Sequence, residues 1–330
     1  MELDADLLAR SDAGEADAQF ALASSLLRSR TATQDQFVMA TSLIDRASAA
    51  GHAGASELRA VFEAMGVGRQ QSWDRSFDAL QLAAEQGSRS AQAQLLLLSD
   101  PSADPQPPEG ASSDFWTEAR LSISLERLMS HGERRALSNA PRIRVIEAFA
   151  SGPECRWLIE RARTMLKAAP VIDVHGNQVV DPSRTNKGTA FELFDMDVVM
   201  EIVRARISAA THIPVPVFEP TQILHYSVGQ EFKPHLDFLE PGNPHHRAQL
   251  DSHGQRIATF LIYLNDEFAG GETEFSQIGL RYRGRTGDAI FWANCDMEGR
   301  PEPLTLHAGL PPISGEKWIL SQWIRDRVAR

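Results

Sequence analysis

The chain has 330 residues and a mass of 36.4 kDa, which is more than one ordinary domain needs. It carries 44 acidic residues against 33 lysines and arginines, a formal net charge of −11. Such an acidic chain is a poor candidate for binding a nucleic-acid backbone. Cys155 and Cys295 are too few for a disulfide framework or a cysteine-based zinc site, so we expect two reduced thiols. No signal peptide or membrane-spanning apolar run is visible, so we expect a cytoplasmic protein without a membrane partner.

The first 100 residues are rich in alanine and leucine, lack proline and show helical periodicity. A Gly-x-x-x-Ala pattern begins at Gly14, Gly51 and Gly87, at spacings of 37 and 36 residues. A period in this range is typical of stacked helix pairs, in which glycine permits a tight turn. This region resembles Sel1-like repeats, which are related to tetratricopeptide repeats. The alternative is an alanine-rich helical bundle with coincidental spacing.

A proline-rich stretch over residues 101–108 breaks the helical pattern and predicts a surface linker. Ser113 then begins a segment with leucines at helical spacing, so we expect a connector helix that runs to about Ser130. The expected organisation is helical repeats over residues 1–100, a linker and connector helix over 101–140, and a third part over 141–330.

The third part changes to a β-rich texture. We expect helices over residues 154–167 and 196–210, and strands over 142–149, 221–228, 257–264, 288–292 and 317–324. Short strands between turns that contain glycine and proline predict a sandwich or barrel, braced by the preceding helices. The fold class expected for the whole chain is therefore multidomain α + β.

His235 and Asp237 are two potential metal ligands at positions i and i+2, whose side chains point to one side of a strand. His307 lies on another candidate strand and offers a third ligand. Two histidines and a carboxylate leave coordination positions open, as in non-haem Fe(II) oxygenases. The spacing alone is a weak signal, because 10 histidines and 44 acids give roughly 1.3 such triplets by chance.

Lys317 follows His307 by ten residues and begins the last expected strand. A lysine inside a barrel is costly unless an anion pairs with it, and a bound dicarboxylate would be such an anion. A lysine at a strand end that reaches solvent is the alternative. Tyr226, nine residues before His235, is a candidate donor to the same anion, and Thr259 shares a strand face with Tyr263.

These features occur in ordered segments over residues 141–328 that resemble the catalytic domain of the prolyl 4-hydroxylase family of Fe(II)- and 2-oxoglutarate-dependent dioxygenases. Asn186 stands where the family pattern Arg-Thr-Ser-x-Gly has serine. The segments that carry the resemblance are residues 141–149, 154–159, 183–189, 219–222, 226–238, 255–265, 270–275, 287–292, 307–308 and 315–318.

The resemblance implies a double-stranded β-helix, or jelly roll, with Fe(II), 2-oxoglutarate and O2 as cofactors and cosubstrates. It implies that His235, Asp237 and His307 bind the iron and are the catalytic residues. Lys317, with Tyr226 and Thr259, would bind the distal carboxylate of 2-oxoglutarate, and ascorbate would serve as reductant. The reaction implied is hydroxylation of a C–H bond, with succinate and CO2 as co-products. Asp237 favours hydroxylation over halogenation, because halogenating relatives lack this carboxylate.

Candidate substrate contacts come from the last expected strand and from the segment after the metal motif. Trp323 matches a family position that lines the active site. Residues 239–254 resemble a loop that covers the active site, and His245, His246 and Arg247 are candidate substrate contacts within it. Solvated loop residues without a role are the alternative.

Three functions agree with these features. The first is hydroxylation of a prolyl residue in a protein or peptide recruited by the helical repeats. The second is hydroxylation of a free amino acid or another small molecule. The third is an interaction scaffold that senses oxygen or 2-oxoglutarate with little turnover, against which the intact ligand set argues. No nucleic-acid partner is expected.

Overall fold

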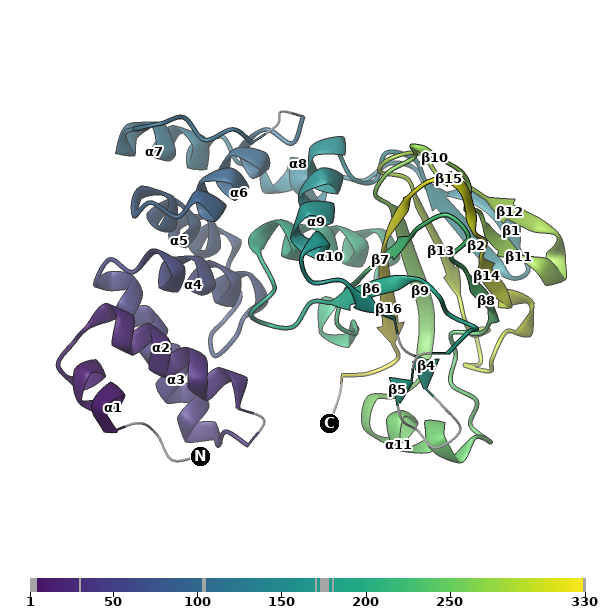
Figure 1. Ribbon diagram of the computed structural model, residues 1–330, viewed down its shortest axis with the longest axis horizontal. Helices are drawn as coiled ribbons and strands as arrows, with labels where there is room; N and C mark the ends of the chain where they lie inside the picture. Colours follow the sequence, from purple (N-terminus) through teal and green to yellow (C-terminus); the bar gives the residue numbers. More distant parts are fainter. Residues whose placement is uncertain are drawn as a thin grey trace. The chain divides into compact units, whose positions relative to one another are not determined.

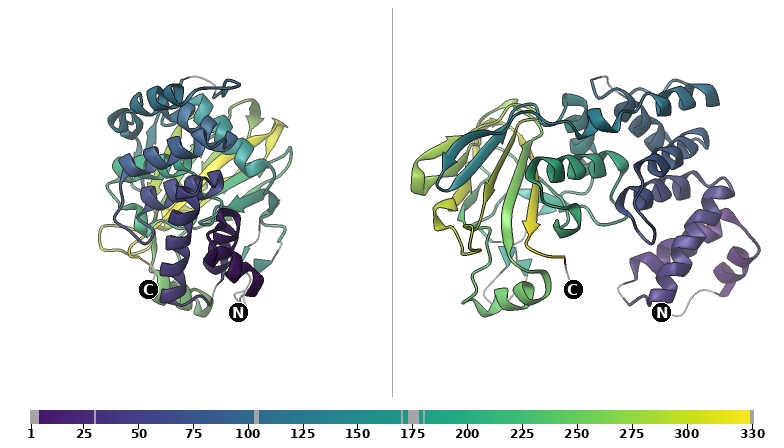
Figure 2. Two further views of the ribbon diagram at one scale, coloured as in Figure 1. Left: turned by 90° about the vertical axis from the view of Figure 1, so that its left-hand side faces the viewer. Right: turned by 180° about the vertical axis from the view of Figure 1, so that it is seen from behind.

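The computed structural model describes residues 5–29, 31–102, 105–169, 171–172, 178–179 and 181–328 (Figure 1). The chain divides into two compact units. Unit 1 comprises Met1–Leu128 with Leu193–Ile202, and unit 2 comprises Met129–Glu192 with Val203–Arg330. Helices gather in the N-terminal part and antiparallel sheets in the C-terminal part, as Figure 2 also shows from two further sides. Within the described ranges, no helix is both long enough and apolar enough to cross a membrane.

The first part of unit 1, over the described residues between 5 and 99, forms three helix pairs stacked in chain order (Figure 1). The glycine that joins each pair adopts a left-handed conformation, with φ of 90° at Gly14, 95° at Gly51 and 94° at Gly87. In each turn the glycine N–H donates at 3.1 Å to the carbonyl three residues earlier. Glycine is favoured there because a β-carbon would strain this conformation. The helices are α1 Ala5–Asp12, α2 Ala16–Arg28, α3 Gln34–Ala49, α4 Ala53–Met65, α5 Trp73–Glu85 and α6 Arg89–Ser99.

The expected connector helix is divided into α7, Ser113–Leu121, and α8, Leu125–Met129. Two serines account for the break, because both hydroxyls bond to the backbone. Ser122 Oγ donates to the Glu118 carbonyl at 2.9 Å, and Ser124 Oγ accepts from the Arg127 N–H at 3.2 Å, which caps a new helix. Leucine spacing alone did not reveal this interruption.

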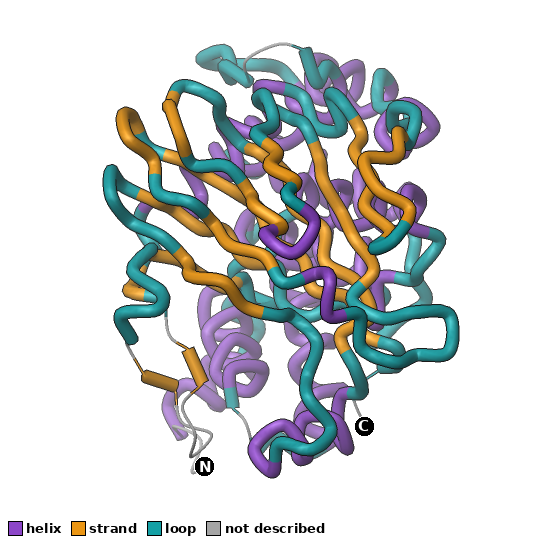
Figure 3. Tube along the Cα trace, turned by 90° about the vertical axis from the view of Figure 1, so that its right-hand side faces the viewer, coloured by secondary structure: helices purple, strands orange, loops and turns teal. Residues whose placement is uncertain are grey.

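Unit 2 contains an eight-stranded sheet and a four-stranded sheet (Figure 3), and every strand pair among the described residues is antiparallel. The larger sheet has the order β1 Arg135–Asn139, β2 Arg142–Ile146, β13 Ala289–Ala293, β9 Arg256–Tyr263, β16 Lys317–Arg325, β7 Gln222–Tyr226, β6 Lys187–Ala190 and β3 Lys167–Ala168. The smaller sheet has the order β12 Leu280–Tyr282, β11 Thr273–Phe275, β14 His307–Gly309 and β8 Phe232–His235. Two short ribbons pair β10 Phe268–Gly270 with β15 Pro312–Gly315, and β4 Val171–Ile172 with β5 Gln178–Val179.

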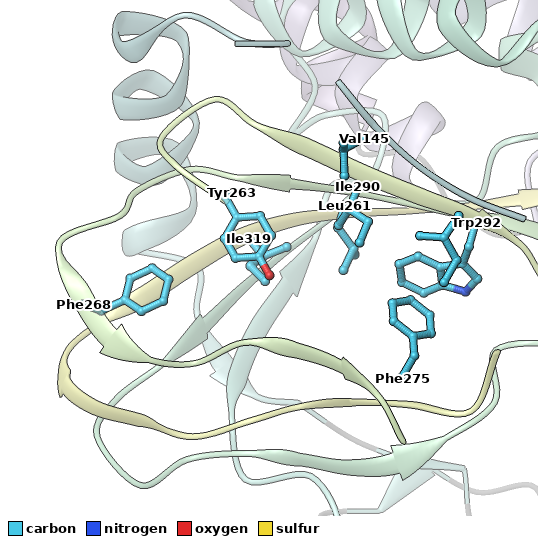
Figure 4. Packing of buried hydrophobic residues seen from close by; sticks show 9 residues of the cluster. Val145, Leu261, Tyr263, Phe268, Phe275, Ile290, Trp292 and Ile319 are labelled. Atoms are coloured by element: carbon cyan, nitrogen blue, oxygen red, sulfur yellow. The ribbon is translucent and has the colours of Figure 1, made fainter. Parts of the chain in front are cut away.

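The two sheets share a hydrophobic core (Figure 4). Phe275 of the smaller sheet packs edge-on against Trp292 of the larger sheet, with ring centroids 5.1 Å apart. Such contacts between facing sheets exclude water from the space between them. The buried members of the cluster are Ile143, Val145, Leu261, Tyr263, Phe268, Phe275, Ile290, Trp292 and Ile319.

The expected strands over 221–228, 257–264, 288–292 and 317–324 are confirmed as β7, β9, β13 and β16, with small shifts at their ends. The expected helices are confirmed as α9, Gly152–Arg163, and α10, Val198–Thr211, but α9 ends four residues before the expected end and Lys167 begins β3 instead. α11, Pro244–His253, lies in the segment expected to be a loop. The short 3₁₀ helices are η1 Val215–Val217, η2 Ser276–Ile278 and η3 Pro303–Thr305.

A buried ion pair joins α9 to α10. Glu154 completes a capping box with Ser151 at the start of α9. The Arg206 guanidinium donates to both oxygens of the same carboxylate, at 2.7 and 3.1 Å, and both side chains are buried. Glu154 therefore links the start of one helix to the middle of the other.

We expect Arg206→Met to lower the free energy of unfolding by about 3–5 kcal/mol, because it leaves the buried Glu154 carboxylate without its counter-charge. Urea denaturation followed by circular dichroism measures this loss. Arg135→Met is the matched control, since Arg135 pairs with Glu147 on the surface and its loss should cost about 0–1 kcal/mol. Equal losses in the two variants would contradict a structural role for the buried pair.

Candidate active site

Unit 2 encloses a cavity between its two sheets. Both sheets contribute side chains to its wall, and the polar ones include two histidines, an aspartate, an arginine and a lysine. The lining residues are Arg184, Leu224, Tyr226, Phe232, His235, Asp237, Thr259, Leu261, Thr273, His307, Ala308, Gly309, Lys317, Ile319, Ser321 and Trp323.

His235, Asp237 and His307 converge in this cavity. His235 ends β8 and stands opposite His307, the first residue of β14, in the strand register. Nε2 of His235 lies 3.8 Å from Asp237 Oδ1, and Nε2 of His307 lies 3.5 Å from Asp237 Oδ2. One ligand atom of each residue lies within 4.8 Å of the others. The strand pairing thus brings His307 to His235 and Asp237, although 70 residues separate it from Asp237 in the sequence.

Both histidine rings are oriented by the main chain. Nδ1 of His235 lies 2.8 Å from the Lys233 carbonyl, and Nδ1 of His307 lies 2.9 Å from the Thr305 carbonyl. A carbonyl only accepts, so each Nδ1 carries a proton and each Nε2 faces Asp237. Burial, reinforced by the neighbouring His307, lowers the pKa of His235 to about 3. The His235 ring is therefore neutral near pH 7, the form that binds metals.

Asp237 completes the donor set as a buried carboxylate. Burial by itself favours the neutral acid, but the two histidines and a 2.6 Å hydrogen bond from Thr259 Oγ1 outweigh it, and the pKa of Asp237 lies below its usual value. Two imidazole nitrogens and one carboxylate are the donors found in non-haem Fe(II) oxygenases. The residues present therefore fit Fe(II).

Lys317 is fully buried in the same cavity, and its Nζ has no hydrogen-bond partner among the described residues. The rings of Tyr226 and Tyr263 lie near it, with centroids 5.1 and 5.5 Å from Nζ. Burial lowers the pKa of Lys317 to about 7. A buried ammonium without a counter-charge is unfavourable, so a carboxylate of a bound molecule fits this end of the cavity.

The strand register separates Thr259 from Lys317. Lys317 stands opposite Tyr226, whereas Thr259 stands opposite Trp323, six residues or about 20 Å further along β16. This differs from the expectation that Thr259 assists Lys317, since the Thr259 hydroxyl faces Asp237 instead.

Thr273 is the cavity threonine near the lysine end, and sequence reasoning did not select it. Its Oγ1 lies 2.8 Å from the Tyr263 hydroxyl, and Tyr263 flanks the Lys317 ammonium. The segment over residues 270–275 was recognised as part of the resemblance. The three-residue strand β11, however, is too short for its inward face to be read from periodicity.

Arg184 is a second cavity residue to which the sequence assigned no role. Its side chain is buried, and its guanidinium lies over the Phe232 ring, 4.6 Å from the centroid. Nε donates to Asn186 Oδ1 at 3.2 Å. Asn186 is the residue that departs from the family pattern, so this chain holds its cavity arginine through an amide. Burial lowers the pKa of Arg184.

The candidate substrate residues are placed differently from one another. Trp323 lines the cavity, and the Arg256 guanidinium lies over its ring at 3.5 Å. His246 and Arg247 lie on α11 and are absent from the described cavity wall. Nδ1 of His246 accepts from the Glu240 N–H at 2.9 Å, and Arg247 is exposed. The side chain of His245 lies outside the described residues.

Comparisons with known proteins point to one family. The family model of the 2OG-Fe(II) oxygenase superfamily matches residues 221–325, which include His235, Asp237, His307 and Lys317. Prolyl 4-hydroxylase 1 of Arabidopsis thaliana is 31% identical over 206 residues, which cover 58% of this chain and 71% of the relative. Prolyl 4-hydroxylase 5 of the same plant is 35% identical over 216 residues, with coverages of 58% and 72%.

A solved structure is also similar. The viral collagen prolyl hydroxylase of Paramecium Bursaria Chlorella virus-1, in a 2OG complex, is 29% identical, with a TM-score of 0.42. The match covers 55% of this chain and 94% of the viral one.

We expect Lys317→Met to raise the free energy of unfolding of the ligand-free protein by on the order of 3 kcal/mol near pH 7. The folded-state pKa of Lys317, about 7, lies below its ordinary value of 10.5. Between these pH values the unfolded chain binds a proton that the folded chain lacks. The wild type therefore gains stability as the pH rises, and the advantage of the variant should shrink toward pH 10.5.

Urea denaturation at several pH values between 7 and 10 measures this difference. Lys187→Met, which replaces an exposed lysine on β6, is the control and should show little effect at any pH. An advantage of Lys317→Met that is absent or that grows with pH would contradict the buried, unpaired ammonium.

Proposed function

Because the chain belongs to the prolyl 4-hydroxylase family of 2OG-Fe(II) oxygenases and is a 2-oxoglutarate-dependent dioxygenase, we propose that it hydroxylates a prolyl residue of a protein or peptide. The observation that carries the proposal is the cavity, which has a two-histidine, one-carboxylate donor set and a buried ammonium without a partner among the described residues. When bound, Fe(II) and 2-oxoglutarate supply the oxygen-activating chemistry that hydroxylates a C–H bond, with succinate and CO2 as co-products.

At the metal end, we assign Fe(II) binding to His235, Asp237 and His307. The main-chain carbonyls of Lys233 and Thr305 accept from Nδ1 of the two rings and so direct both Nε2 atoms inward. Both rings are therefore pre-oriented, and metal binding requires no change of tautomer.

At the other end, Lys317 pairs with the distal carboxylate of 2-oxoglutarate, and we assign the Tyr226 hydroxyl as a donor to the same carboxylate. The Tyr263 hydroxyl donates to the Tyr282 carbonyl, so Thr273 donates to Tyr263 and holds the ring that flanks the ammonium. The carboxylate would restore the pKa of Lys317 toward its ordinary value, because it provides the missing counter-charge. Specificity for a dicarboxylate follows, since a cosubstrate without the second carboxylate would leave the ammonium unpaired.

The substrate end is assigned to Trp323, which lines the cavity beside Thr259 in the strand register. Its indole ring is fixed from one side by Arg256, which is held by both carboxylate oxygens of Glu219 at 2.6 and 2.9 Å. A flat, rigid aromatic surface suits the ring of a prolyl residue.

We extend the proposal to the architecture and the reductant. The two facing sheets would form a double-stranded β-helix, and the three helix pairs would be Sel1-like repeats that recruit the protein substrate. The three equivalent glycine turns support the repeats, and arrays of this kind present extended binding surfaces. Ascorbate is the proposed reductant.

The test is oxygen-dependent succinate formation from 2-oxoglutarate with Fe(II), ascorbate and a panel of peptides with and without proline. We expect proline-containing peptides to stimulate turnover and to gain the mass of one oxygen atom on the prolyl residue. Asp237→Ala should reduce turnover to background because it removes the metal carboxylate. Glu160→Ala, which removes an exposed carboxylate on α9, should retain activity.

Other outcomes identify the alternatives. Stimulation by free amino acids but not by peptides would favour a small-molecule hydroxylase. Binding of 2-oxoglutarate without turnover on any member of the panel would favour a sensing scaffold and contradict the proposal.

A further inference from the structure

The three candidate metal ligands are held by different kinds of partner. His235 and His307 are oriented by main-chain carbonyls, which no substitution removes. Asp237 is held by a side chain, Thr259, which is itself held by the side chain of Asn294. The Asp237 carboxylate therefore contacts, directly and through one further bond, the side chains of two residues that are not metal ligands, Thr259 and Asn294.

These side chains form a continuous buried chain of hydrogen bonds. Asn294 Nδ2 lies 3.0 Å from Thr259 Oγ1, and Thr259 Oγ1 lies 2.6 Å from Asp237 Oδ2. Their exposed fractions are 0%, 1% and 3% for Asn294, Thr259 and Asp237. Water therefore does not compete for these bonds, and each is worth more than it would be on the surface.

Proton counting fixes the direction of the chain. A threonine hydroxyl has one proton, and an ionised carboxylate only accepts, so Thr259 donates to Asp237. The contact with Asn294 must then run from its amide nitrogen, because an amide oxygen would compete for the same proton. Asn294 Oδ1 has no hydrogen-bond partner within the described part of the chain. The amide thus serves as a donor to Thr259.

The backbone keeps both members in place. Asn294 directly follows β13; its N–H donates to the Ile257 carbonyl at 2.8 Å, and its carbonyl accepts from the Glu302 N–H at 2.9 Å. Thr259 lies within β9, between β13 and β16 in the sheet, and its β-branched side chain has restricted rotation. The sheet therefore fixes the backbone positions from which both side chains reach the carboxylate.

We propose that Asn294 and Thr259 are positioning residues that hold Asp237 Oδ2 and leave Oδ1 as the single carboxylate oxygen for the metal. A carboxylate that bound through both oxygens would occupy a coordination position that the cosubstrates need. The proposal rests on the metal site assigned above, and it gives Thr259 a role at the metal end of the cavity.

The first test is the affinity of the ligand-free protein for Mn²⁺ alone, measured from the electron paramagnetic resonance signal of the free ion. Thr259→Val keeps the shape of the side chain and removes the hydroxyl, and we expect it to raise the Kd about 10- to 100-fold. Thr259→Ser restores the hydroxyl and should bring the Kd back toward the wild-type value. This rescue separates the hydrogen bond from packing.

The second test asks whether Asn294 acts through Thr259. Asn294→Leu should weaken Mn²⁺ binding in the wild-type background and should have no further effect beside Thr259→Val. Asn265→Leu is the matched control. Asn265 bonds to the main chain of Glu316 and Trp318, so its loss should reduce stability but not metal affinity. Urea unfolding checks that each variant is folded. If Asn294→Leu does not fold, Asn294→Ser takes its place in the test.

Three results would overturn the proposal. Wild-type protein that binds no Mn²⁺ would remove the assigned metal site and the positioning role with it. Equal affinities of wild type and Thr259→Val would remove the positioning role and leave the metal site intact. Equal effects of Asn294→Leu in both backgrounds would show that Asn294 does not act through Thr259.

Discussion

The register of β16 between β7 and β9 decides where the polar groups of the cavity lie. It places Lys317 opposite Tyr226 and Trp323 opposite Thr259, so a charged end and an aromatic end are separated along one strand. A slip of one residue would turn every inward side chain of β16 to the other face of the sheet. The shared hydrophobic core opposes such a slip. Ile319 lies on the same face of β16 as Lys317, so a slip that turned Lys317 away from the cavity would also remove Ile319 from the core.

This arrangement places function in conflict with stability. The cavity buries the Lys317 ammonium at one end and the Asp237 carboxylate at the other. Asp237 is in contact with Thr259 and His307 rather than with Lys317. The ammonium is unfavourable until a counter-charge arrives, whereas the two histidines and Thr259 already favour the ionised form of Asp237. Metal and cosubstrate binding therefore stabilise the folded unit by supplying the missing partners, which couples ligand occupancy to stability.

Much of unit 2 could be predicted because its signals are local. The apolar runs that form β9 and β16, the spacing of His235 and Asp237, and the candidates His307 and Lys317 are readable in sequence, and the resemblance supplied the roles of these residues. The contacts that complete the site are not local. The positions of Thr259 and Thr273 in the cavity depend on strand pairing. Asn294 enters the site through a hydrogen bond to Thr259, which lies 35 residues earlier in the sequence. The break between α7 and α8 depends on the hydrogen bonds of two serine hydroxyls.

The central claim is that one cavity binds a metal at the His235–Asp237–His307 end and a dicarboxylate at Lys317, and proton uptake tests it most directly. Calorimetric titration of 2-oxoglutarate into anaerobic Fe(II)-loaded protein near pH 8.5, in buffers of different ionisation enthalpy, measures the protons taken up. Because the pKa of Lys317 is about 7 without a partner, its ammonium should re-form on binding. The account predicts uptake approaching one proton per 2-oxoglutarate, absent in Lys317→Met. Binding without proton uptake, or equal uptake in the variant, would contradict it.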